Sequence, residues 1–370
     1  MKKILFLIHD LGSGGAEKVL VNLMNNLDTK KFDITVMSLF DVGVNRKYLP
    51  KNIRYQFCFK KMFRGNSHLM KLLNPEQLHQ RLIHEHYDIE VAYLEGPCAR
   101  MISGCPCGDT KLVAWIHTEH QNRNRVAMAF RTFGEAVRCY NRFERIVCVS
   151  ESVRKDFVSL IKPKVPVCVL YNTNEYKKIV DASRERVGNA LFDEPIFRMA
   201  AVGKLSENKG FGRLLKIAYK LKQEKYSFRL FILGEGPEKS KLKKFVKDYG
   251  LINYVEFLGY QQNPYKYVAK CDLFVCASYR EGFSTAAVEA LIVGTPVCTV
   301  RVSGMDEMLG NNNEYGVITE NNEESLMNGI RKFLDDSELV EYYRAKAFER
   351  RRIFQADKTA GAVEKMLLAL

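Results

Sequence analysis

Two carboxylates in the second half of the chain have the spacing and the surroundings of a ligand-binding site. Glu281 and Glu289 bracket the small-residue run Gly-Phe-Ser-Thr-Ala-Ala within the segment SYREGFSTAAVEALIVGTPV. A carboxylate accepts hydrogen bonds from hydroxyl groups, at about 1.5 to 3 kcal/mol for each charged acceptor. The pair therefore fits a ligand rich in hydroxyls, unless it is only the solvated face of a helix.

The residues around the two acids predict where a helix begins and ends. The apolar run DLFVCA is typical of a buried strand, so the loop at its carboxyl end starts at Ser278. Ser284 or Thr285 is a good helix N-cap, and Gly294 supplies a left-handed stop. We therefore expect a helix that starts near residue 285 and runs to about residue 292.

This placement separates the two acids, with Glu281 in the loop and Glu289 on the second helical turn. The backbone N–H groups of residues 284–287 have no partner within such a helix, and the helix dipole favours an anion beside them. A phosphate at the helix start, with hydroxyls on both sides of it, would use every part of the arrangement. A nucleotide sugar has that layout.

Two further loops of the second half follow predicted strands. In the first, Gly203 precedes Lys204 and Lys209, and two lysines beside free amides suit a diphosphate. In the second, Gly234 lies in Leu-Gly-Glu-Gly-Pro, which is either a tight strand-to-helix turn or a ligand contact.

A glycine-rich turn also follows the first predicted strand, where Gly14 and Gly15 precede a helix and predict an anion-binding turn. The dinucleotide fingerprint needs another small residue where Glu17 stands, and no acid closes the second strand. The sequence therefore disfavours a nicotinamide cofactor. A tight turn without a ligand is the alternative.

Short apolar, β-branched runs alternate with amphipathic stretches along the chain, one of them a helix expected at about residues 126–143, and the pattern restarts near residue 197. This predicts an α/β fold with two Rossmann-like doubly wound domains that face a central cleft. We place the domains at residues 1–172 and 173–350, with a linker at about 173–195. A C-terminal helix at 351–370 is expected to pack back on the first domain.

The charge and composition of the chain limit the kinds of molecule that it is expected to bind. The net charge is +14, and residues 1–172 carry +10 of it, with 26 Lys and Arg against 16 Asp and Glu, which favours an anionic partner for the first domain. The ten cysteines lack the spacing of a zinc site, so no metal is expected. His79, His84 and His86 lie at a predicted helix end and are interpreted as solvated, or as favourable to the helix dipole when charged. No export signal or membrane-spanning run is expected, because the apolar start MKKILFLI is too short.

The motifs together resemble retaining glycosyltransferases of family 4, which have the two-domain GT-B fold and act in bacterial surface polysaccharide synthesis. The resemblance extends over nearly the whole chain and rests on eight segments in order: LIHDLGSGGAEKVLVNL, IVCVSESVRKDF, VLYNTN, VGKLSENKG, ILGEGPEKSKL, FLGY, EGFSTAAVEALIVGTPV and SGMDEML. It implies an N-terminal acceptor domain and a C-terminal domain for the nucleotide-sugar donor.

Carried over residue by residue, the resemblance assigns Lys204 and Lys209 to the donor diphosphate, Glu281 to hydroxyls of the donor sugar and Glu289 to the ribose. The family usually has Arg where Lys204 stands, so the bidentate fork is lost there. His117 matches a histidine near the reacting sugar. The remaining donor-binding positions that the resemblance or the loop pattern suggests are Gly14, Gly15, Gly203, Gly234, Gly282, Phe283, Ser284 and Thr285.

The resemblance implies transfer, with retention, from a nucleotide-diphosphate sugar, with UDP as the expected nucleotide, to a hydroxyl of a saccharide acceptor that we expect to be lipid-linked. It favours a front-face reaction over a covalent glycosyl-enzyme, and it requires neither metal nor cofactor. Segments 51–73 and 123–145 mix basic and aromatic residues, which suits an anionic membrane surface. We therefore expect a cytoplasmic protein, peripheral on the inner face of the cell membrane. A solvated helix face is the alternative for each segment.

Two other functions fit part of the sequence. A sugar-nucleotide epimerase shares the fold but would want acid and base groups around the sugar C2. A basic binding protein without catalysis would suit the net charge, yet no RNA-binding or zinc-finger signature supports nucleic acid as a partner.

Overall fold

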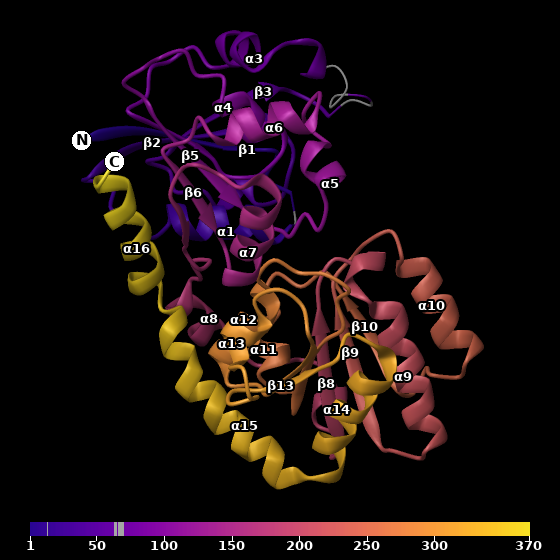
Figure 1. Ribbon diagram of the computed structural model, residues 1–370. Helices are drawn as coiled ribbons and strands as arrows, with labels where there is room; N and C mark the ends of the chain where they lie inside the picture. The colour runs from indigo at the N-terminus through magenta and orange to yellow at the C-terminus, as the bar shows by residue number, and fades with distance from the viewer. Residues whose placement is uncertain (13, 63–64, 66–69) are drawn as a thin grey trace. The chain divides into compact units, whose positions relative to one another are not determined.

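The computed structural model describes residues 1–12, 14–62, 65 and 70–370 (Figure 1). The chain divides into two compact units. Unit 1 consists of Met1–Asn174 together with Ala356–Leu370, and unit 2 is Glu175–Gln355. Parts of the basic segment 51–73, including Phe63 and Arg64, lie outside the described residues.

Unit 1 is built on a parallel seven-stranded sheet in the order β3-β2-β1-β4-β5-β6-β7. The strands are β1 Lys2–Ile8, β2 Phe32–Phe40, β3 Arg54–Phe59, β4 Ile89–Ala92, β5 Lys111–Ile116, β6 Arg145–Cys148 and β7 Val167–Val169. The helices are α1 Gly15–Met24, α3 Pro75–Leu82, α4 Pro97–Ile102, α5 Arg123–Ala127, α6 Phe133–Tyr140, α7 Glu151–Ile161 and α16 Ala356–Leu368, and Arg46–Tyr48 forms the short 3-10 helix η1.

Unit 2 repeats the plan with a parallel six-stranded sheet in the order β10-β9-β8-β11-β12-β13. Its strands are β8 Phe197–Val202, β9 Phe228–Leu233, β10 Val255–Gly259, β11 Leu273–Cys276, β12 Val297–Val300 and β13 Val317–Thr319. Its helices are α8 Tyr176–Ser183, α9 Phe211–Gln223, α10 Lys239–Asp248, α11 Tyr265–Val268, α12 Thr285–Val293, α13 Met305–Leu309, α14 Glu323–Asp335 and α15 Ser337–Arg350, with 3-10 helices η2 Ala190–Phe192, η3 Glu207–Lys209 and η4 Arg351–Phe354.

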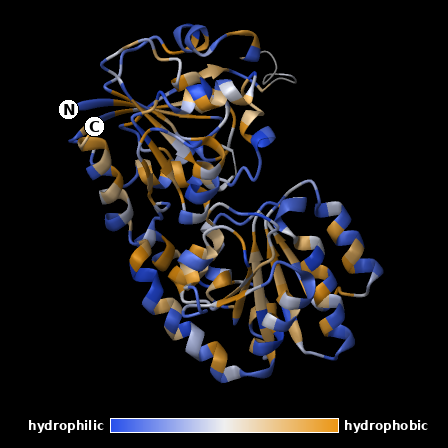
Figure 2. Ribbon diagram, in the orientation of Figure 1, coloured by the Kyte–Doolittle hydropathy of each residue, from blue (hydrophilic) through white to orange (hydrophobic). Residues whose placement is uncertain are grey.

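The central strands of both sheets are mostly apolar and largely buried. β1 is buried from Ile4 to Ile8, and all four residues of β11 and of β12 are buried. Figure 2 shows the strands in hydrophobic colours, while many helices carry a hydrophilic face. A parallel sheet covered by helices on both faces has this pattern, because neither face meets water.

Strand order reverses once in each sheet, between β1 and β4 in unit 1 and between β8 and β11 in unit 2. At such a point the loops after the two neighbouring strands run in opposite directions and leave a crevice at the carboxyl edge of the sheet, where open α/β sheets bind ligands. The predicted fold class, two Rossmann-like doubly wound domains, is confirmed.

The segment between the domains is more ordered than the sequence indicated. The linker expected at 173–195 contains α8 and η2, and α8 contacts α11 and α12 of unit 2. The sequence reasoning missed these helices because it interpreted the segment as a linker on the absence of a strand-like run. The helix expected at 126–143 is two helices, since Thr132 adopts an extended conformation and caps the second one by accepting from the Glu135 N–H group.

The chain returns to unit 1 at its C-terminal end. α16 is grouped with unit 1 from Ala356 onward, whereas the sequence placed the start of the last segment at residue 351. The Lys2 ammonium donates to the carbonyls of Leu367 and Leu368 at 3.2 and 3.1 Å, and Lys31 pairs with Glu364 at 2.6 Å. Within the described ranges, no helix has the length and apolar character needed to cross a bilayer.

Candidate functional site

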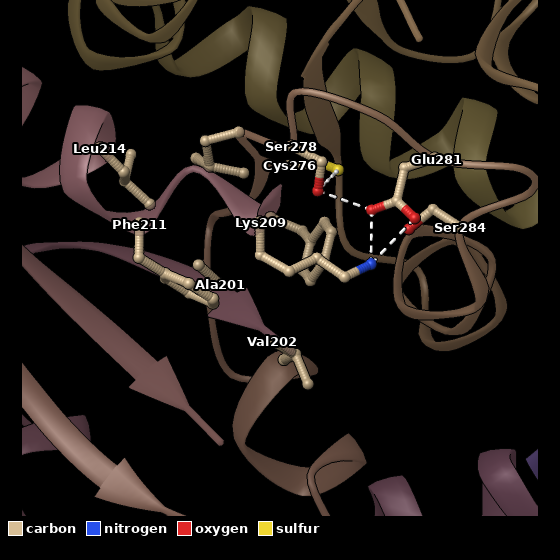
Figure 3. Close-up of a pocket in the computed structure, with 12 residues that line it drawn as sticks. Ala201, Val202, Lys209, Phe211, Leu214, Cys276, Ser278, Glu281 and Ser284 are labelled. Atoms are coloured by element: carbon tan, nitrogen blue, oxygen red, sulfur yellow. Dashed lines mark hydrogen bonds and ion pairs between the residues drawn. The ribbon is translucent and has the colours of Figure 1, made fainter. Parts of the chain in front are cut away.

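Lys209 and Glu281 meet at the crevice of unit 2. Lys209 ends η3 in the loop after β8, and Glu281 lies in the loop after β11, the neighbouring strand in the sheet. The Lys209 ammonium lies 2.7 and 2.9 Å from the two carboxylate oxygens of Glu281 (Figure 3). The sequence assigned these residues to different parts of one ligand, and the structure joins them directly.

The carboxylate of Glu281 is well enclosed. Its side chain is 10% exposed, and the Ser278 hydroxyl donates to Oε1 at 2.6 Å. Burial lowers the pKa of the Lys209 ammonium, but the charge of Glu281 and its hydrogen bonds outweigh burial and leave that pKa raised. Lys209 is therefore held in its charged form beside the crevice.

A pocket surrounds this pair at the carboxyl edge of the sheet (Figure 3). Its lining combines the ends of β8 and β11 with the first residues of the helices that follow them, and includes Val202, Lys209, Phe211, Cys276, Ser278, Glu281 and Ser284. The polar side chains in this set come from the loops, while the strands contribute apolar walls.

The start of α12 follows the predicted cap. Ser284 is the N-cap, its hydroxyl accepts from the Ala287 N–H group at 3.4 Å, and Gly294 ends the helix with φ of 85°. The prediction that the N–H groups of residues 284–287 are all open was wrong for Ala287, because its N–H group donates to the Ser284 hydroxyl. Thr285 is the first helical residue.

The other residues of this segment are mostly enclosed. Glu289 lies on the second turn of α12 and is 6% exposed. The Phe283 side chain is buried and packs edge-on against Phe354, with ring centroids 6.2 Å apart. Phe283 is therefore suited to a ligand contact through its backbone and not through its ring.

The two glycines chosen from the loops of unit 2 have a structural reason for being glycine. Gly203 and Gly234 have φ of 159° and 140°, and a Cβ atom on Gly234 would lie 1.9 Å from the Gly203 carbonyl oxygen. Their N–H groups donate to the carbonyls of Leu233 and Gly259. Lys204, directly after Gly203 in the chain, is exposed and forms no ion pair with any residue that the structure describes.

The glycine-rich turn of unit 1 lies after β1, beside the reversal of strand order. Gly14 is the N-cap of α1 in an extended conformation, and Gly15 is the first residue of the helix. Ser13, between Gly12 and Gly14, lies outside the described residues.

His117 follows β5 and is almost completely buried, at 7% exposed. Burial lowers the pKa of the imidazole to about 4, against smaller opposing effects of the Glu95 charge and of a hydrogen bond to the backbone of Tyr93. Nε2 has no partner among the described atoms, so Nδ1 makes that backbone bond and donates to it. The neutral ring therefore presents an unused acceptor.

Glu95 was missed by the sequence reasoning. Its carboxylate accepts from the backbone N–H group of His117 at 2.9 Å and from the Thr118 hydroxyl at 2.6 Å. It follows the strand IEVAYL and lies in the loop after β4, beside the reversal of strand order. A single acid directly after a buried strand was the available indication.

The interpretation of His79 as solvated was wrong. Its Nε2 lies 2.8 Å from Glu90 of β4, both side chains are buried, and the Cys105 thiol lies 3.8 Å from the same carboxylate. His79 faces inward because it follows the apolar stripe of α3, one position after Leu78. These three side chains lie outside the candidate site.

The basic–aromatic segments differ from expectation in their aromatic part. Phe130, Tyr140 and Phe143 are at most 1% exposed and belong to the core of unit 1. Leu72 and Met128 are instead exposed, at 72% and 70%. Amphipathic spacing contributes to this difference, because α6 buries Ala136, Cys139 and Tyr140 while its Arg138 is exposed.

The chain is similar to known glycosyltransferases in sequence and in fold. The family model for glycosyl transferases group 1 matches residues 184–350, and that for glycosyltransferase family 4 matches residues 13–173. Together the two models span most of the chain. The chain belongs to glycosyltransferase family 4 and is a glycosyltransferase with the GT-B fold.

One relative is similar over the full length of both chains, at 28% identity: N-acetylgalactosamine-N,N'-diacetylbacillosaminyl-diphospho-undecaprenol 4-alpha-N-acetylgalactosaminyltransferase of Campylobacter jejuni. Among solved structures, Anabaena Alr3699/HepE in complex with UDP and glucose covers both chains fully at 20% identity, with a TM-score of 0.75. Sucrose-phosphate synthase from Thermosynechococcus elongatus also covers both chains, at 16% identity and a TM-score of 0.79.

Proposed function

We propose that this glycosyltransferase moves a sugar, with retention of anomeric configuration, from a UDP-sugar to a hydroxyl of a saccharide linked through a diphosphate to a polyprenol lipid. The observation that carries the proposal is the meeting of Lys209, Glu281 and the start of α12 at the crevice of unit 2. A cation, a carboxylate and open helix amides match the diphosphate and the hydroxyls of a nucleotide sugar.

The donor is held in this proposal at three points. Lys204 and Lys209 bind the diphosphate together with the amides at the start of α12, the carboxylate of Glu281 accepts from sugar hydroxyls, and Glu289 accepts from the ribose. Donor binding then places an anion beside Lys209 in addition to Glu281. The UDP-bound structure of HepE, with the same fold, makes UDP the first nucleotide to test.

The reaction in this proposal depends on positioning and on charge. Lys204, Lys209 and the helix amides stabilise the diphosphate as it leaves, which is where negative charge develops. The leaving phosphate takes the proton of the attacking hydroxyl, so that no metal or other cofactor is needed. Neutral Nε2 of His117 is suited to accept a hydrogen bond from a hydroxyl of the reacting sugar.

The acceptor is proposed from the relative in Campylobacter jejuni, whose name gives a diphospho-undecaprenol saccharide as acceptor and an alpha linkage in the product. An alpha-configured donor gives an alpha product only with retention. Similarity over the full length of both chains favours the same class of acceptor for this chain, while the sugar itself is left to experiment.

Such an acceptor lies in a membrane, and unit 1 offers a surface for it. Arg131 donates to the carbonyls of Lys71 and Leu72 at 2.6 Å each, which ties the segment at Leu72 to the α5–α6 region that carries Met128. Two exposed apolar side chains accompanied by exposed basic residues suit the interface of an anionic bilayer. We propose peripheral attachment to the cytoplasmic face of the membrane through this surface, called the Leu72–Met128 surface below.

The test is a transfer assay with the purified chain, a panel of UDP-sugars that includes UDP-N-acetylgalactosamine, and an undecaprenyl-diphosphate saccharide acceptor in detergent. We expect one donor to give a longer lipid-linked saccharide, with the new linkage alpha by NMR. A beta linkage would overturn retention, and no product from any donor would overturn the proposed reaction.

The same panel without acceptor separates transfer from epimerisation. A sugar-nucleotide epimerase would convert its substrate when incubated alone, whereas a transferase leaves the sugar configuration unchanged. Appearance of an epimer would favour the epimerase.

A further inference from the structure

Arg213 is a buried cation without a carboxylate partner in the described parts of unit 2. It lies on α9 and is 5% exposed, and burial lowers the pKa of its guanidinium. Its neighbours on the buried face of α9 include Phe211, Leu214 and Ile217. Because a buried charge is costly unless it is fully hydrogen-bonded, packing alone would favour an apolar side chain at this position.

The hydrogen bonds of Arg213 are directed at the loop that carries Glu281. Nε donates to the Ala277 carbonyl at 2.6 Å and Nη2 to the Ser278 carbonyl at 2.8 Å. Nη1 donates to the side chain of Asn321 at 2.8 Å, and the guanidinium lies over the Tyr279 ring, 4.3 Å from its centroid. The donors of one side chain thus span the start of the loop.

The next two carbonyls of the loop are held as well. Asn321 donates to the Tyr279 carbonyl at 3.3 Å, and Asn208 donates to the Arg280 carbonyl at 3.1 Å. All four consecutive carbonyls from Ala277 to Arg280 therefore accept from a side chain of another segment. A loop on the surface normally leaves such groups to water, and its conformation is correspondingly free.

The loop also lies directly against the backbone at Gly210, between η3 and α9. A Cβ atom on Gly210 would be 1.8 Å from the Ala277 carbonyl oxygen. Ser278 then links the held backbone to the carboxylate, since its carbonyl accepts from Arg213 and its hydroxyl donates to Glu281 at 2.6 Å.

We propose that Arg213 is a positioning residue for sugar transfer, which fixes the loop Ala277–Arg280 and thereby holds the Glu281 carboxylate in the geometry that the donor sugar requires. The inference rests on the proposed function, in which Glu281 binds sugar hydroxyls. Arg213 itself touches neither donor nor acceptor in this scheme. A fixed carboxylate binds without first paying to order the loop.

The test compares Arg213→Met and Arg213→Lys with the wild type and with Arg229→Met. Arg229 is a suitable control because it is a largely buried arginine of the same unit, near the amino end of β9, where it pairs with Glu194 at 2.7 Å. Each protein is measured for kcat/KM with the donor found active on the wild type, for affinity to UDP and to the UDP-sugar, and for hydrogen exchange of residues 277–281.

We expect Arg213→Met to lower kcat/KM for the donor about 100-fold, the loss typical of a reacting group misplaced by about 1 Å. Affinity for the UDP-sugar should fall while affinity for UDP stays within about twofold, and exchange at 277–281 should rise. Arg213→Lys, which can reach only part of the loop, should be intermediate. Arg229→Met should change none of these readings.

Unchanged kcat/KM and unchanged exchange in Arg213→Met would overturn the inference. Should that variant not fold, Asn321→Ala removes one bond to Arg213 and one to Tyr279 from an exposed position, and it should raise loop exchange and lower kcat/KM several-fold. A wild type with no transfer activity would instead count against the proposed function, while the exchange comparison would still test whether Arg213 holds the loop.

Discussion

The Lys209 ammonium and the Glu281 carboxylate form a hydrogen-bonded ion pair, 2.7 and 2.9 Å long, between two loops that are 72 residues apart in the chain. Their strands β8 and β11 are neighbours at the reversal of strand order, which is why loops so distant in sequence come together. The cation and the acid of the proposed donor site are therefore coupled in the protein without a donor.

Removing one member of this pair should cost more than removing both. Lys209→Met leaves a carboxylate that is 10% exposed, with Ser278 as its remaining partner among the described residues, and we expect a loss of about 1 to 3 kcal/mol in the free energy of unfolding. The double variant Lys209→Met with Glu281→Gln should recover part of that loss. Urea unfolding of all four proteins measures the coupling, and simple additivity would contradict it.

Glu281 and Glu289 should differ in the part of the donor that each recognises. Glu281→Gln should reduce transfer about 100-fold or more while leaving the affinity for UDP nearly unchanged, because the acid is assigned to the sugar. Glu289→Gln should weaken UDP and UDP-sugar alike, by about tenfold, since the ribose belongs to both. Calorimetric titration with UDP and with the UDP-sugar distinguishes the two. Equal effects on both ligands from Glu281→Gln would refute the assignment.

The sequence was sufficient for much of this site because its parts are local. A buried strand, Ser284 as N-cap and Gly294 as left-handed stop fixed Glu281 in a loop and Glu289 on a helix, and the structure agrees. Periodicity likewise predicted both sheets. Pairing across the sheet was not accessible in this way, because the approach of Lys209 to Glu281 depends on which strands are neighbours.

The sequence alone also could not identify residues that act by holding other residues in place. Arg213 occupies an ordinary position of an amphipathic helix, and its proposed role is inferred from hydrogen bonds to carbonyls more than sixty residues later in the chain. Glu95 is likewise identified by its partners His117 and Thr118. Aromatic residues in segment 123–145 were assigned to an interface because basic neighbours dominated the pattern, whereas burial placed Phe130, Tyr140 and Phe143 in the core.

His117 should give the protein a pH-dependent stability. Its pKa is about 4 in the folded chain, against 6.5 for an ordinary imidazole, so between these two pH values the unfolded chain binds the proton more readily than the native one. The free energy of unfolding therefore falls as pH decreases from 6.5 to 4, by up to ~3 kcal/mol from this group.

Urea unfolding at several pH values in this window should show a shallower dependence for His117→Gln than for the wild type. His86→Gln is a matched control, because His86 is exposed and its side chain keeps contact with water. Parallel curves for wild type and His117→Gln would contradict a neutral, buried imidazole.

The Leu72–Met128 surface should determine attachment to anionic membranes. Leu72→Asp with Met128→Asp should reduce binding to phosphatidylglycerol vesicles about tenfold or more, because each change replaces an exposed apolar contact with a charge of the lipid's own sign. Transfer to an acceptor in detergent should persist. Lys243→Asp and Lys244→Asp on α10 of unit 2 serve as the charge control. Vesicle binding that stays at the wild-type level would exclude this surface.

The return of α16 to unit 1 has a consequence for how the protein is made. The residues from Ala356 onward that complete unit 1 follow the whole of unit 2 in the chain, so they are synthesised after unit 2. β1 pairs with β2 and β4 from the first half of the chain, whereas the Lys2 ammonium at its start donates to carbonyls of α16, which is synthesised last. Synthesis of unit 1 therefore begins before that of unit 2 and is completed after it.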